Sequence, residues 1–124
     1  ALHAYGRHLG LAYQVVDDML DLLGSSDSLG KPAGADMASG HATAPALYAM
    51  DEYPELEDLI RRKFKWDGDV EKALELTMAS DAMQRTAELA TSHAQKAADA
   101  LGILPPSVAR DGLLRLCSDV LNRK

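Results

Sequence analysis

Residues 10–21 read Gly10-Leu11-Ala12-Tyr13-Gln14-Val15-Val16-Asp17-Asp18-Met19-Leu20-Asp21. In and around this stretch, apolar residues recur at spacings of three and four, which is the period of one face of an α-helix. The pattern starts at Leu2 and stops at Leu23, just before a glycine suited to a helix end. It therefore predicts a helix over residues 2–23 with one buried face.

Composition extends this prediction to the whole chain. The 124 residues include 20 Ala and 19 Leu, but only 11 Val, Ile and Thr together. Ala and Leu favour helices, whereas β-branched residues favour strands. We therefore expect an all-α fold, and the length suits a single domain.

Charge and cysteine content exclude several classes of protein. The formal net charge is −6, which opposes a protein that binds nucleic acid by neutralising phosphates. Cys117 is the single cysteine, so no internal disulfide forms, and no Cys/His cluster has zinc spacing. Apolar runs are too short for a transmembrane segment.

Residues 24–40 interrupt the helical pattern. Glycine and serine are frequent there, and we expect a glycine-rich functional loop. Shorter helices follow, over about residues 45–50, 54–62 and 70–78, the last capped by Asp67 or Asp69. Ser80 is expected to cap a long helix over 81–101, and Ser107 a final amphipathic helix.

Three acids occupy one part of the first predicted helix. Asp17 and Asp21 are four residues apart and share a face, while Asp18 lies about 100° round the axis. Stacked carboxylates repel each other unless a cation lies between them, and hard oxygen ligands suit Mg²⁺, which is typically shared with substrate phosphates. The spacing thus favours a magnesium site for a polyphosphate, although a solvated acidic face is the plain alternative.

Other residues complement this acidic face. Gln14 precedes Asp17 by one turn. Lys31, set among glycines, can act as a point charge toward phosphate. Asp36 can order the loop or act on a metal through water.

The motif resembles the second aspartate-rich motif of the trans-isoprenyl (polyprenyl) diphosphate synthases. The matching residues are Tyr13-Gln14, Asp17-Asp18-x-x-Asp21, Gly30-Lys31 and Asp36. The runs 43–50 and 50–56 resemble the long-chain branch, most of all the solanesyl diphosphate synthases of plants and algae. The resemblance covers essentially the whole chain, as the C-terminal half of the family's fold.

The resemblance implies a function and a mechanism. The fold would be an all-α helical bundle around a cavity, in which Mg²⁺ ions hold an allylic diphosphate that isopentenyl diphosphate then extends. Asp17 would bind magnesium directly, Asp21 directly or through water, and Asp18 would support the site. Gln14 and Lys31 would contact the diphosphate or its hydrated metal.

Two departures from the family pattern matter. His41 stands where many members have lysine, and the loss of that charge weakens one phosphate contact without excluding activity. The first aspartate-rich motif and the basic residues for isopentenyl diphosphate have no match here. We therefore expect the isolated chain to be inactive and to need a second polypeptide. The resemblance also implies an oligomer in a plastid or mitochondrion.

Two other functions are compatible with the sequence. The chain could be a non-catalytic structural or regulatory subunit derived from a synthase, or part of another diphosphate-ionising enzyme such as a terpene cyclase. The intact acidic set opposes the first, whereas the missing N-terminal half favours it. Gly30-Lys31 with Thr43-Ala44-Pro45 opposes the second.

The remaining candidate residues have structural interpretations. His3, His8, His41 and His93 are scattered and form no ligand set with Cys117, which is expected in the core. Trp66 is expected to anchor packing.

Overall fold

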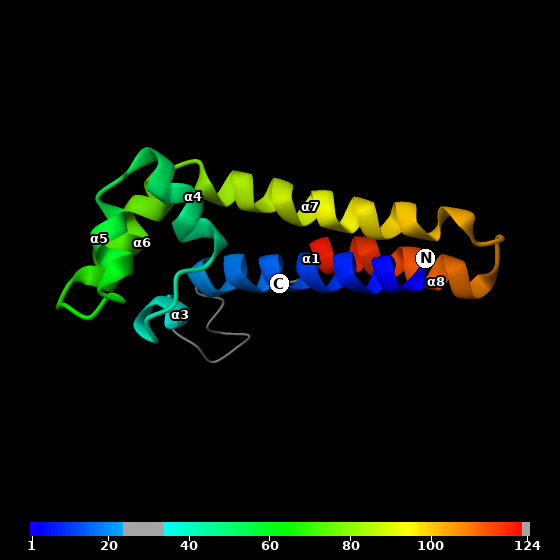
Figure 1. Cartoon of the computed structure of the whole chain (residues 1–124), viewed down its shortest axis with the longest axis horizontal. Helices are drawn as coiled ribbons and strands as arrows, with labels where there is room; N and C mark the ends of the chain where they lie inside the picture. Colours follow the sequence, from blue (N-terminus) through cyan, green and yellow to red (C-terminus); the bar gives the residue numbers. More distant parts are fainter. Residues whose placement is uncertain (24–33, 123–124) are drawn as a thin grey trace. The chain divides into compact units, whose positions relative to one another are not determined.

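The computed structural model describes residues 1–23 and 34–122, and all regular structure in these ranges is helical (Figure 1). The elements in chain order are α1 (Leu2–Leu23), α3 (Ala35–Ala38), α4 (Ala44–Glu52), α5 (Leu56–Arg61), α6 (Asp69–Ala79), α7 (Ala82–Ala100), the 3₁₀ turn η1 (Leu101–Ile103) and α8 (Val108–Leu121). The all-α prediction is confirmed, and the predicted helices begin and end within two residues of those found. Across the described ranges, no helix combines the length and apolar character that a membrane span requires.

The chain divides into two compact units. The first comprises described residues 1–16 and 87–122, which contribute the start of α1, most of α7, η1 and α8. These helices share a core of Tyr5, Ala97, Leu101 and Cys117, and the Tyr5 hydroxyl donates a hydrogen bond of 2.9 Å to the carbonyl of Leu113. Small residues along α7, namely Ala90, Ala94 and Ala97, are buried, which lets neighbouring helices approach closely.

The second unit is Asp17–Thr86, with the end of α1, helices α3 to α6 and the start of α7. Helices α4, α5 and α6 pack against one another. The core of this unit is made of apolar side chains from each of its helices: Leu22, Met37, Ala46, Ala49, Leu56, Leu59, Phe64, Ala73, Leu76 and Ala82.

Serine caps begin two helices, as predicted. The Ser80 hydroxyl accepts a hydrogen bond of 3.0 Å from the Ala82 amide, and the Ser107 hydroxyl accepts one of 3.0 Å from the Arg110 amide. Each cap satisfies an amide that has no partner within the helix.

The predicted aspartate cap of α6 is wrong. Gly68, with φ +87°, occupies the cap position, and Asp69 lies in the first turn. The buried Asp69 carboxylate accepts hydrogen bonds of 2.7 and 2.8 Å from Arg62, and one of 3.1 Å from the Trp66 amide. The Asp69 carboxylate therefore pairs with Arg62 and does not cap the helix.

Trp66 does not anchor packing in the core. Its side chain is 66% exposed, and the Arg62 guanidinium lies 3.9 Å from the centre of its ring. The indole forms a cation–π contact at the surface instead.

The stretch predicted as a loop contains one turn of helix. Helix α3 forms within it because Met37, 1% exposed, is drawn into the core of the second unit. Residues 24–33 of the predicted loop lie outside the described residues.

Candidate functional site

Helix α1 carries the three predicted carboxylates in its last two turns. Asp17, Asp18 and Asp21 are each half-buried. Buried Val16, Leu20 and Leu22 alternate with them. Because these apolar side chains fix the rotation of the helix, the helical period turns the three acids to the side of α1 away from its buried face.

Asp21 connects α1 to α3. Its carbonyl accepts a hydrogen bond of 3.1 Å from the Gly34 amide, and its carboxylate Oδ2 accepts one of 3.3 Å from the Asp36 amide. The structure thus brings together two of the predicted site residues, Asp21 and Asp36. The contact runs through the backbone of Asp36, and the Asp36 side chain is half-buried.

Two glycines fix the path of the chain around α3. Gly34 has φ +77°, and a Cβ there would lie 3.1 Å from Cδ1 of Leu74. Gly40 has φ +88°, and a Cβ there would lie 3.3 Å from Cβ of Lys63. Left-handed backbone and close contact both favour glycine at these positions. The position of Asp36 beside Asp21 is therefore built into the backbone.

The other predicted site residues lie on α1, after α3, or outside the described residues. Gln14 is exposed on α1. His41 is exposed after α3, and its amide donates a hydrogen bond of 2.8 Å to the carbonyl of Asp36. Lys31, the predicted phosphate contact, lies outside the described residues.

The acidic residues of α1 suit magnesium by their chemistry. In residues 1–23 and 34–122, no three His, Cys, Asp or Glu side chains are grouped so as to hold a metal ion by themselves. Mg²⁺ needs only one or two protein carboxylates when waters and phosphates supply the other oxygens. Asp17 and Asp21, one turn apart, match that requirement.

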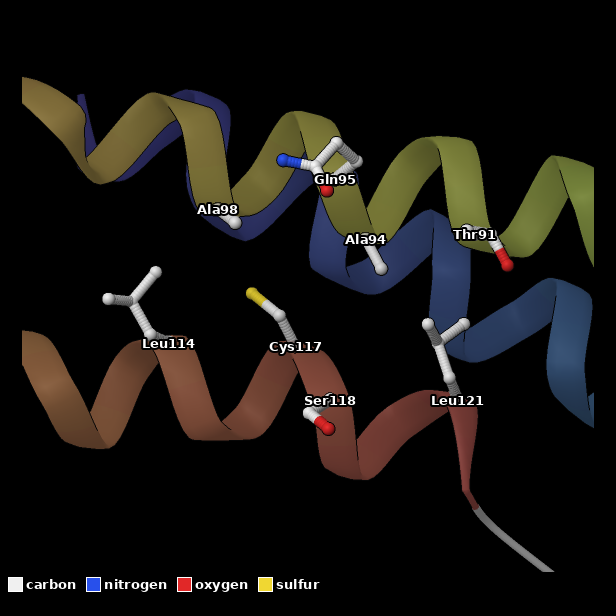
Figure 2. A pocket seen from close by; sticks show the side chains of 8 residues that line it. All are labelled: Thr91, Ala94, Gln95, Ala98, Leu114, Cys117, Ser118 and Leu121. Carbon is white, nitrogen blue, oxygen red and sulfur yellow. The ribbon is translucent and has the colours of Figure 1, made fainter.

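A groove of about 250 Å³ lies between α7 and α8 (Figure 2). Its lining is apolar or neutral, with Ala94, Ala98, Leu114 and Cys117 among its residues and no acid or base. Burial raises the pKa of the Cys117 thiol, which keeps it protonated and unreactive near neutral pH. None of the predicted site residues lines this groove, so it is not the predicted diphosphate site.

The structure also pairs two histidines that the sequence left scattered. Nδ1 of His8 on α1 lies 3.1 Å from Nδ1 of His93 on α7. The two residues are 85 positions apart, so no local spacing in the sequence indicates this contact.

Comparisons with known proteins agree with the fold. The family model for polyprenyl synthetase matches residues 1–77. The chain is 51% identical to a prenyl transferase of Synechocystis over 98% of this chain and 38% of that protein. It is 48% identical to a probable mitochondrial hexaprenyl pyrophosphate synthase of Yarrowia lipolytica, over 99% of this chain and 27% of that protein.

The comparison with a solved structure also indicates similarity to a polyprenyl synthase. The polyprenyl synthase of Caulobacter crescentus, crystallised with calcium and isoprenyl diphosphate, superposes with a TM-score of 0.82 at 38% identity. The match covers 98% of this chain and 39% of that one. The chain thus spans about two fifths, or less, of the length of these relatives. By sequence and by fold, the chain belongs to the polyprenyl synthetase family.

Proposed function

We propose that this chain supplies the second aspartate-rich site of a polyprenyl diphosphate synthase. The complete enzyme adds isopentenyl diphosphate head-to-tail to an allylic diphosphate. The observation that carries this proposal is the acidic end of α1, where Asp21 is tied through its carboxylate to the backbone of α3. A purely structural helix would not need this set of three carboxylates.

In this proposal, Asp17 and Asp21 hold Mg²⁺, and Asp18 supports them. When bound, magnesium supplies positive charge that offsets the charge of the departing diphosphate. Gln14 and Lys31 contact the diphosphate or water around it. Asp21 is kept in position by the hydrogen bond to its carboxylate and the bond to its carbonyl.

Two observations support a divalent cation here. The donor set consists of hard carboxylate oxygens one helical turn apart, which is what Mg²⁺ prefers. In addition, the Caulobacter relative was crystallised with calcium and isoprenyl diphosphate. Both point to a divalent metal, and the Caulobacter structure adds isoprenyl diphosphate as the ligand class.

The proposal includes a second polypeptide segment. The relatives are more than twice as long as this chain. On α1, Leu11 is 39% exposed and Tyr13 is 46% exposed, next to the predicted site. We infer that further polypeptide covers these exposed side chains and supplies the rest of the site, and that the chain by itself does not elongate prenyl diphosphates.

A chimera tests this function. The chain would replace the matching segment of the Synechocystis prenyl transferase, to which it is 51% identical. We expect the purified chimera with Mg²⁺ to extend an allylic diphosphate with radiolabelled isopentenyl diphosphate, and the 124-residue chain alone to form no product. A folded chimera without turnover, or turnover by the chain alone, would contradict the proposal.

We also propose a plastid or a mitochondrion as the cellular location. The mitochondrial name of the Yarrowia relative and the cyanobacterial source of another support an organelle. Fractionation of cells followed by immunoblotting for the chain would show which of the two organelles contains it.

A further inference from the structure

His8 and His93 form a close contact between α1 and α7, inside the first unit. Their Nδ1 atoms are 3.1 Å apart, and the rings are stacked at 24° with their centres 5.3 Å apart. Both side chains are half-buried. The diphosphate chemistry proposed above makes no use of this pair.

The contact depends on how many protons the two rings carry. A hydrogen bond between two ring nitrogens needs one N–H donor and one bare acceptor, which neutral imidazoles provide when their tautomers are complementary. One added proton can be accommodated, because N⁺–H···N is a charge-assisted hydrogen bond. A second added proton places two cationic N–H groups face to face, and the contact is lost.

Burial and nearby positive charges oppose the protonation of His93. Burial lowers the pKa of His93, and the positive charges of His8, Lys96 and Arg7 lower it further. Arg7 and His8 lie on α1, and Lys96 lies on α7 itself. The titratable groups of the adjoining α1–α8 core are Cys117 and Tyr5, and burial raises the pKa of each, so both stay uncharged.

We propose that the His8–His93 contact is an acid-sensitive connection between α1 and α7, closed at neutral pH and broken when both rings are protonated. In a histidine with a lowered pKa, the unfolded chain binds the proton more readily than the folded one. The contribution of His93 to the free energy of unfolding is therefore fully present above the ordinary histidine pKa of about 6.5, and it decreases as the pH drops below that value. Within that window, the unfolding constant rises by up to about tenfold per pH unit for each proton taken up.

Asparagine variants of the full chain test this proposal. Asparagine places an amide close to the position of Nδ1 but does not titrate, so we would compare His8→Asn, His93→Asn and the double variant with the native chain. His3→Asn is the matched control, because His3 is exposed on the same helix. Urea unfolding followed by circular dichroism between pH 7.5 and 5 gives stability, and NMR of the imidazole protons gives each pKa.

We expect acid to lower the stability of the double variant less than that of the native chain. The His3→Asn control should be destabilised by acid as much as the native chain is. We also expect His8→Asn to raise the pKa of His93, because one opposing positive charge is removed. The NMR result stands on its own if the double variant folds poorly. An ordinary pKa for His93 that does not change in His8→Asn would overturn the proposal, as would equal acid sensitivity in the native chain and a folded double variant.

Discussion

Asp21 combines a structural and a proposed chemical task in one residue. Its carbonyl and carboxylate both accept hydrogen bonds from the chain around α3. The same carboxylate is a proposed magnesium ligand. These tasks make different demands, because the hydrogen bond needs only an acceptor oxygen whereas the metal needs negative charge.

Substitutions at Asp21 separate the two tasks. Asp21→Ala removes the acceptor and should lower the free energy of unfolding by about 1 kcal/mol, the net value of a typical hydrogen bond. Asp21→Asn keeps an acceptor oxygen and should stay close to native stability while losing elongation activity in the chimera. Urea denaturation and the isopentenyl transfer assay measure the two effects. Full activity in Asp21→Asn would contradict the proposal that this residue binds the metal.

Some contacts of single residues could not be foreseen from the sequence. The face shared by Asp17 and Asp21 follows from helical spacing alone, and the sequence predicted it. The partner of Asp69 depends instead on the turn that brings Arg62 next to it. The His8–His93 contact joins residues that are 85 positions apart in the chain. Such pairs arise from tertiary packing, which leaves no periodic signal.

At the scale of elements, α3 and the glycine before it supply the amides that donate hydrogen bonds to Asp21 at the acidic end of α1. Helix α3 has four residues, too few for a stable isolated helix, and it depends on Met37 in the core and on left-handed glycines at Gly34 and Gly40. The long helices were predictable because each has a sustained apolar period. Helix α3 was not, since one buried methionine gives no period.

Gly40→Ala tests how far α3 depends on backbone shape. Alanine at φ +88°, 3.3 Å from Cβ of Lys63, should lower the free energy of unfolding by about 1–2 kcal/mol. The control is Gly112→Ala, inside α8 with no atom within 4 Å of the added Cβ. That change should raise stability by about 0.5–1 kcal/mol through helix propensity. Thermal unfolding by calorimetry gives both values, and equal effects at the two positions would contradict this account of α3.

At the scale of the whole molecule, each of the two units has its own apolar core. The proposed acidic site lies at the end of α1, and the chain spans 38% of the length of its Synechocystis relative. The sequence motif identified the family because the acidic spacing is local to one helix. The solanesyl branch and the role of Lys31 remain predictions.

The central claim is that the acidic end of α1 binds the metal that activates a prenyl diphosphate. The most direct measurement is the turnover of the chimera carrying Asp17→Asn, beside Asp99→Asn, which changes an exposed aspartate of α7. We predict that Asp17→Asn lowers kcat by at least about 100-fold, as expected for loss of a group that stabilises transition-state charge, while Asp99→Asn leaves it unchanged. Native turnover in a folded Asp17→Asn chimera would contradict the claim.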